Sequence, residues 1–127
     1  MPKEPSPSHR SIGDHGETIA VNYLLSQGYT IIDRNYQIKG GEIDIVAQKG
    51  GFHIFIEVRY RYSDTYGHPL DTFSPSKKRT LKRAIMIYIS KHKIDSEHIR
   101  IDFIGIMPYY KKNGGFFRLW HIKGINL

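Results

Sequence analysis

Hydrophobic positions follow two different spacings along the chain, and these spacings predict its secondary structure. In "GETIAVNYLLSQ", Ala20, Val21 and Leu24 follow Glu17 at the i+3, i+4 and i+7 positions of a helix. In "GEIDIVAQ" and "FHIFIEVRYR", apolar residues alternate with polar ones or run together, as they do in strands of a sheet. The predicted helices span 11–27 and 76–92, and the predicted strands span 29–38, 41–48, 52–61, 99–107 and 116–122.

The order of these elements is α-β-β-β-α-β-β, which predicts an α/β domain with a mixed β-sheet flanked by helices. A chain of 127 residues has the length of one domain. Residues 1–10, with three prolines and two serines, predict a flexible tail, so the single domain is expected over 11–127. No apolar run approaches the roughly 20 residues that cross a bilayer, and the start lacks the apolar core of a signal peptide. We therefore expect a cytoplasmic protein with no membrane contact.

Charge and cysteine content narrow the chemistry. The formal net charge is +7 and the sequence pI is about 9.6, which favours a polyanionic partner such as nucleic acid. The absence of cysteine excludes a disulfide framework, a thiolate nucleophile and a cysteine zinc site. The seven histidines are scattered and lack the spacing of a helical zinc pair. A histidine zinc site is therefore not expected, and several enzyme classes are excluded.

A pair of carboxylates is predicted at the Gly50-Gly51 hairpin. If these glycines form a two-residue turn, residues whose numbers sum to 101 lie opposite one another, which pairs Asp44 with Glu57 and Glu42 with Arg59. All four would then share one face of the sheet. The opposite face is expected to hold an apolar layer of Ile43, Ile45, Ala47, Ile54, Ile56 and Val58.

Opposed acids need a positive partner. Side chains opposite one another have Cβ atoms about 4.5–5.5 Å apart, and two like charges at about 4 Å repel by roughly 4 kcal/mol at an effective dielectric of 20. One solution is a divalent cation, Mg²⁺ or Mn²⁺, held by both carboxylates. The other is an ion-pair network in which Arg59 and Arg61 neutralise the acids. Glu17 favours the metal, because a third carboxylate on a core-facing stripe fits the clustering of perturbed acids at functional sites, although the helix dipole alone would favour an acid there.

A basic cluster occupies the start of the second predicted helix. Five basic residues with no acid among them fall between positions 77 and 83: Lys77, Lys78, Arg79, Lys82 and Arg83. Such a cluster, joined by Arg61, could contact phosphates and position nucleic acid without reading its sequence. The alternative is an ordinary solvated helix face.

These residues match a known pattern. "GEIDIVA…IFIEVRYR" resembles the motif of the PD-(D/E)XK nuclease superfamily, in which an acid on one strand is followed by Glu-X-Lys on the next. The stretches "GETIAVNYLLSQGYTIIDRNYQIKGGEIDIVA", "YGHPLDTFSPSKKRTLKRA" and "RIDFIGI" resemble the small YraN-like family over about residues 10–107. That family is similar in fold to Holliday junction resolvases and restriction endonucleases, so the resemblance implies a restriction endonuclease-like fold.

The resemblance also implies roles for individual residues. Asp44 and Glu57 match metal ligands, and Glu17 matches the helix acid that assists them in resolvase-like members. Glu42 precedes the motif acid and could be an outer ligand, and Lys77 matches a basic position that would lie toward the phosphates.

One position departs from the superfamily motif, because Arg59 stands where the motif has lysine. Arginine keeps the positive charge that would offset phosphate charge, but it cannot act as a base because it is effectively always protonated. The departure therefore leaves activity open while nucleic-acid binding would survive.

Three hypotheses follow. The first is a metal-dependent, resolvase-like endonuclease that uses Asp44, Glu57, Glu17 and Arg59 on branched nucleic acid, with DNA expected. The second is a catalytically weak or inactive nucleic-acid-binding module of the same fold. The third is a protein-interaction domain whose exposed aromatics contact a partner: Tyr60, Tyr62, Tyr66, Tyr109 and Tyr110. A resolvase that cuts two strands needs two sites, and "FFRLWHI" could supply the edge strand of a homodimer.

Overall fold

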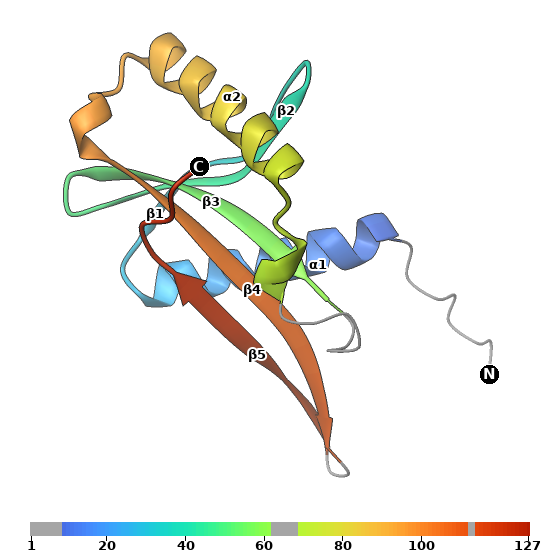
Figure 1. Ribbon diagram of the computed structural model, residues 1–127. Helices are drawn as coiled ribbons and strands as arrows, with labels where there is room; N and C mark the ends of the chain where they lie inside the picture. The colour runs from blue at the N-terminus through green and yellow to red at the C-terminus, as the bar shows by residue number, and fades with distance from the viewer. Residues whose placement is uncertain (1–8, 62–68, 112–113) are drawn as a thin grey trace.

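The computed structural model describes residues 9–61, 69–111 and 114–127 (Figure 1). Residues 1–8 of the expected tail lie outside these ranges, as do Tyr62 and Tyr66. The elements are α1 (His9–Ser26), β1 (Thr30–Ile38), β2 (Gly41–Lys49), β3 (Phe52–Tyr60), the 3-10 helix η2 (Pro69–Thr72), α2 (Pro75–His92), the 3-10 helix η3 (Ser96–His98), β4 (Ile99–Lys111) and β5 (Gly114–Ile122). The predicted order α-β-β-β-α-β-β is confirmed, with the two 3-10 helices added.

The strands form one five-stranded mixed sheet in the order β1-β2-β3-β4-β5. Neighbouring strands are antiparallel except β3 and β4, which are parallel. Helix α2 lies between them in the chain and provides the crossover that parallel neighbours require (Figure 1). No helix among the described residues is long and apolar enough to cross a membrane.

The two helices cover opposite faces of the sheet, so the protein has two apolar cores. Ala20 and Leu24 of α1 pack on the face that includes Ile45, Ile54 and Ile104. Helix α2 packs on the other face through Leu81, Ala84, Ile85 and Tyr88, against Val46, Phe55 and Phe103. The two faces therefore carry separate environments, and each polar group can be assigned to one of them.

Both ends of α2 are capped. At its start, the Ser74 hydroxyl accepts a hydrogen bond from the Lys77 backbone N–H, and Pro75 occupies the first turn. At its end, Lys93 adopts a left-handed conformation with φ 53°, and its N–H donates to the Ile89 carbonyl.

Close packing brings the start of α2 onto β2. A Cβ atom added at Gly41 would lie 2.5 Å from the Thr80 carbonyl oxygen, so only glycine permits this approach. Lys77, one turn before Thr80, is thereby held near the sheet.

The β2–β3 register is the one predicted from the turn. Ile45 pairs with Ile56 and Lys49 with Phe52, and the numbers of each pair sum to 101. The predicted apolar layer, however, is wrong at Ile43, which packs in the α2-side core with Val46 and Phe55. The β2–β3 ladder ends at Ile45, and residues 41–43 pair only with β1. Regular alternation between the faces is therefore lost at Asp44, one residue after Ile43.

Candidate functional site

Two carboxyl groups meet where the β2–β3 ladder ends. Glu57 is buried on the α2 side of β3, and Asp44 is partly buried at the neighbouring position of β2. The two carboxyl groups lie close enough for the charge of Asp44 to raise the pKa of Glu57, and Asp44 Oδ2 accepts a hydrogen bond from the Val58 backbone N–H at 2.8 Å. Asp44 and Glu57 therefore form a carboxyl pair at the end of the ladder.

The protein environment raises the pKa of both Asp44 and Glu57. Burial raises the pKa of Asp44 to about 6, although the Val58 N–H opposes this shift. Burial and the charge of Asp44 raise the pKa of Glu57 to about 8, against the opposing charge of Arg59. Both carboxyl groups therefore release their protons at a higher pH than ordinary carboxyl side chains do.

Two cations reach the same acids. Arg59 Nη2 lies 2.7 Å from Glu57 Oε1, while Arg59 Nε is buried and has no hydrogen-bond partner among the described residues. Lys77 lines, with Glu42, Glu57 and Arg59, a cavity of about 140 Å³. Burial and the charge of Arg59 lower the pKa of Lys77, whereas the three nearby carboxylates oppose that shift. A buried guanidinium N–H without a partner and a nearby ammonium suit an oxygen-rich anion.

Glu17 lies beside the pair but is held by another residue. It is buried on α1, and its Oε1 lies 3.1 Å from Arg34 Nε. Its charge makes a small contribution to the raised pKa of Asp44. Sequence reasoning missed Arg34, although β1 pairing places it opposite Ile45, one residue from Asp44. No group of three histidine, aspartate or glutamate side chains in the described part of the chain is arranged to hold a metal ion.

The predicted basic cluster divides into parts. Among its members only Lys77 lines the acid cavity. Lys78 places its ammonium 5.6 Å from the centre of the Phe73 ring. Arg79, Lys82 and Arg83 are exposed along α2, and Arg61 follows β3, where its N–H donates to the Ile106 carbonyl. The exposed members remain available to a ligand outside the cavity.

Of the five tyrosines proposed to contact a partner protein, Tyr60, Tyr109 and Tyr110 lie within the described ranges. Tyr60 packs against the α1-side core and is half-buried, so it is not the freely exposed ring that was expected. Tyr109 and Tyr110 belong to β4.

A second polar cluster, which the sequence analysis did not single out, lies around Asp102. This carboxylate is fully buried on β4 and receives both Arg100 Nε and Nη2, at 2.9 and 2.8 Å. His121 Nε2 lies 2.6 Å from it, and the Gly124 N–H donates at 3.1 Å. Burial alone would raise the pKa of Asp102, but these partners outweigh burial and lower it. The strand pattern of "IRIDFIGI" was the available signal, since Asp102 occupies a position that alternation assigns to the core.

The network continues toward α1. Arg100 Nη2 donates to the Tyr29 hydroxyl at 2.7 Å, and the Tyr23 hydroxyl lies 2.8 Å from His121 Nδ1. Tyr29 belongs to the α1-side core, so this network and the Asp44–Glu57 cavity lie on opposite faces of the sheet. We assign the network to the stability of the fold.

Fold and site together define an α/β protein with a mixed five-stranded sheet and a buried carboxyl pair at the start of its crossover helix. The chain belongs to the family described as "Uncharacterised protein family UPF0102", whose model matches residues 16–106. A UPF0102 protein of Carboxydothermus hydrogenoformans is 48% identical over 99 residues, covering 78% of this chain and 84% of that protein. Another, from Pelobacter propionicus, is 36% identical over 118 residues, covering 91% and 82%. The matched range includes Glu17, Asp44, Glu57 and Lys77.

Proposed function

We propose that the protein is a metal-dependent nuclease that hydrolyses phosphodiesters at the Asp44–Glu57 pair. The observation that carries this proposal is the meeting of Glu57, Arg59 and Lys77 at one cavity, with Asp44 beside Glu57 as a second carboxyl group of raised pKa. The donor set fits Mg²⁺ or Mn²⁺, because hard cations prefer carboxylate oxygens and Mg²⁺ commonly uses one or two carboxylates together with waters and substrate phosphate. Two ligands therefore suffice, and Glu17 would assist from beside Asp44.

The charged residues in and beside the cavity would divide the work of this mechanism between metal binding and phosphate binding. A bound metal ion would supply a water of lowered pKa and polarise the phosphoryl oxygen. Asp44, fixed by the Val58 N–H, and Glu57 would hold that ion. Arg59 and Lys77 would donate hydrogen bonds to the phosphate and offset the charge that develops on it. Arg34 orients Glu17 through their ion pair.

The substrate that we propose is branched nucleic acid, with DNA favoured, in the cytoplasm. The exposed basic residues of α2, with Lys78 and Arg61, would hold the phosphate backbone outside the cavity. Strand β5 is an edge of the described sheet, so pairing of two copies along β5 would give a homodimer with two sites for two strands.

A cleavage panel tests this function. Branched, nicked, linear and single-stranded substrates are incubated with excess protein in Mg²⁺ or Mn²⁺, and single-turnover rates are measured against EDTA controls. We expect metal-dependent cleavage, fastest on branched duplexes. The absence of metal-dependent cleavage on every substrate would refute the nuclease proposal.

One observation favours a second candidate, a nucleic-acid-binding module without catalysis. The Arg59–Glu57 ion pair neutralises one of the two acids without a metal ion, which is the alternative solution to the repulsion between them. Binding of branched duplexes without cleavage in the same panel would select this candidate.

Arg59→Lys is expected to raise Mg²⁺-dependent cleavage by about tenfold. A lysine ammonium is compact and, when desolvated, can titrate nearer to neutrality than a guanidinium, so it can assist the attacking water. Binding measured in Ca²⁺ should barely change, because the charge at position 59 is kept. The matched control is Lys91→Arg in the exposed last turn of α2, which also exchanges one cationic side chain for the other and should leave the rate unchanged. A slower Arg59→Lys variant would show that arginine itself is the working residue.

The stabilisation of the protein by Mg²⁺ is expected to increase with pH. Because the folded pKa values of Asp44 and Glu57 are raised to about 6 and about 8, the native pair keeps protons that the unfolded chain releases near pH 4. The pair's contribution to stability therefore falls as pH rises through 6 and 8, and metal competes with fewer protons there. The shift in Tm caused by Mg²⁺ should be small at pH 5.5 and large at pH 8.5. A shift that is equal at both pH values would contradict metal binding at this pair.

A further inference from the structure

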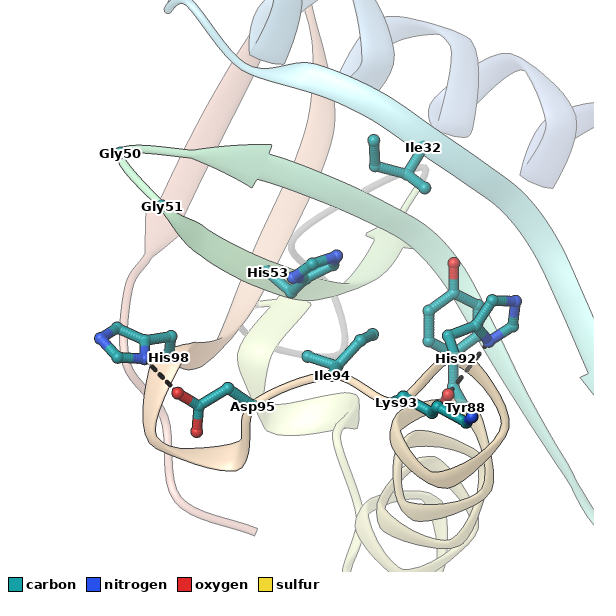
Figure 2. A pocket seen from close by; sticks show the side chains of 10 residues that line it. All are labelled: Ile32, Gly50, Gly51, His53, Tyr88, His92, Lys93, Ile94, Asp95 and His98. Atoms are coloured by element: carbon teal, nitrogen blue, oxygen red, sulfur yellow. Dashed lines mark hydrogen bonds and ion pairs between the residues drawn. The ribbon is translucent and has the colours of Figure 1, made fainter.

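A larger pocket lies at the opposite end of α2 from the acid cavity. It has a volume of about 570 Å³ and lies between the β2–β3 hairpin, the last turn of α2 and the segment leading into η3 (Figure 2). That volume falls within the range of small-molecule sites. Gly50 and Gly51 stand at its rim, and Cβ atoms added to them would meet no atom within 4 Å, so the rim is open.

An aromatic stack forms one wall of this pocket. The rings of His92 and Tyr88 are stacked, with centroids 3.9 Å apart and planes 21° apart. The Tyr88 hydroxyl donates a hydrogen bond to Asp33 Oδ2 at 2.9 Å, which holds the Tyr88 ring in place. The His92 ring that stacks on it is exposed. His92 Nδ1 lies 3.0 Å from the Tyr88 carbonyl. A carbonyl only accepts, so Nδ1 carries a proton and Nε2 of the neutral ring is left as an acceptor.

Two further histidines add polar groups. Figure 2 shows His53 between the His92–Tyr88 stack on one side and the Asp95–His98 pair on the other. His53 Nε2 lies 3.0 Å from the Gln48 amide nitrogen, which only donates, so His53 carries its proton on Nδ1. His98 Nδ1 lies 2.7 Å from Asp95 Oδ2. The pocket therefore presents donors and acceptors together, which suits the edge of a nucleobase, whereas a bare phosphate only accepts.

Charge and apolar surface complete the walls. Ile32 and Ile94 provide apolar contact, and Lys93 provides an ammonium. The carboxylate of Asp95 is already bonded to the Glu97 N–H and to His98. A planar base against the stack with a phosphate at Lys93 would use all of these groups. The three histidines belong to no group arranged for a metal ion in the described part of the chain.

We propose that this pocket binds one unstacked nucleotide of the nucleic acid whose backbone is cut at the Asp44–Glu57 pair. The inference rests on the proposed function and names its substrate feature, an extrahelical base. His53 and Glu57 point to the same face of β3, since they are four residues apart on one strand. Lys77 and His92 are 15 positions apart on α2, which is about 22 Å at 1.5 Å per residue. That span corresponds to roughly six nucleotides at about 3.4 Å each.

Binding measurements in Ca²⁺, which separate this inference from cleavage, provide the test. A duplex with a one-nucleotide bulge is compared with its fully paired form. We expect the wild type to bind the bulged duplex about tenfold more tightly, in line with the strength of base–aromatic stacking. His92→Ala, which removes the exposed ring, and Lys93→Gly, which removes the ammonium at a φ that glycine adopts freely, should each lose most of that preference. Lys91→Ala is the matched control, since it removes one ammonium from the same turn of α2 but does not line the pocket.

The outcomes are distinct. A preference for the bulge that depends on His92 and Lys93 supports the inference even if the cleavage panel is negative, in which case only the nuclease proposal fails.

A second experiment measures the binding of free AMP and CMP from the NMR shifts of the histidine rings. Tight binding of either mononucleotide, without any preference for the bulge, would make a soluble nucleotide the ligand and overturn the inference. Equal affinity for both duplexes with no mononucleotide binding would also overturn it.

Discussion

Asp44→Asn is expected to abolish Mg²⁺-dependent cleavage, with a single-turnover rate at least about 10³-fold lower than that of the wild type. Metal ions contribute several kcal/mol of transition-state charge stabilisation, and about 4 kcal/mol corresponds to that factor. The asparagine keeps the size of the side chain and an oxygen that can accept the Val58 N–H, so the local fold should be retained. The rate is measured on the branched substrate that the wild type cleaves fastest.

Stability provides the control for this variant. Asp44→Asn removes one member of a pair whose charges repel, so in EDTA at pH 8 its Tm should equal or exceed that of the wild type. The rise in Tm caused by Mg²⁺ should disappear. A variant that is folded and still cleaves within about tenfold of the wild-type rate would exclude Asp44 as a metal ligand.

Asp102→Asn is expected to lower the free energy of unfolding by about 3–5 kcal/mol, the usual cost of removing one partner from a buried ion pair. The carboxylate accepts hydrogen bonds from Arg100 at both oxygens, from His121 and from the Gly124 N–H. The asparagine leaves Arg100 without its counter-charge and presents an N–H where two donors already point. Urea unfolding at pH 7 measures the difference. Asp95→Asn is the matched control, because Asp95 also contacts a histidine but is exposed and asparagine caps equally well.

The same variant has a defined pH dependence. The folded pKa of Asp102 is lowered, so its contribution to stability is present above the unfolded pKa near about 4 and is lost as pH falls through the folded value. The difference in stability between wild type and Asp102→Asn should therefore narrow in acid. A difference that stays constant from pH 7 to well below pH 4 would show that the carboxylate charge is not the stabilising element.

The hairpin that holds the acids could be predicted from sequence because one local feature determines it. Gly50 and Gly51 both adopt positive φ, 58° and 81°, and such a two-residue turn fixes the pairing of every residue that follows in the ladder. The prediction for Ile43 was wrong because counting residues from the turn assumes that side chains alternate between the two faces without a break. The pairing of β2 with β3 stops at Ile45, so this assumption does not hold for Asp44 and Ile43. Where the pairing of two strands stops depends on the other strands of the sheet. The sequence pattern of β2 and β3 alone holds no information about those strands.

Interactions between distant segments were beyond the sequence pattern. Asp102 and His121 are brought together by β4–β5 pairing, in which Ile104 lies opposite His121. Glu17 and Arg34 come from a helix and a strand that touch only after α1 packs on the sheet. The sequence did place Lys77 near the acids through the family resemblance, whereas charge alone could not distinguish it from its neighbours on α2. Only the packing of α2 against Gly41 shows which lysine lines the cavity.

The parallel pairing of β3 with β4 also has a consequence for how the chain acquires its structure. Strands β1, β2 and β3 are joined by short turns, whereas β3 and β4 pair residues such as His53 and Ile99, which are 46 positions apart. Hairpins close in about 1–10 μs, and contacts of long sequence separation form more slowly. Asp44 and Glu57 are therefore expected to meet before α2 delivers Lys77. During that interval Arg59, which lies on β3 itself, offsets part of their repulsion. A proton or a divalent cation would offset the rest, so acid pH or Mg²⁺ is expected to favour the early hairpin.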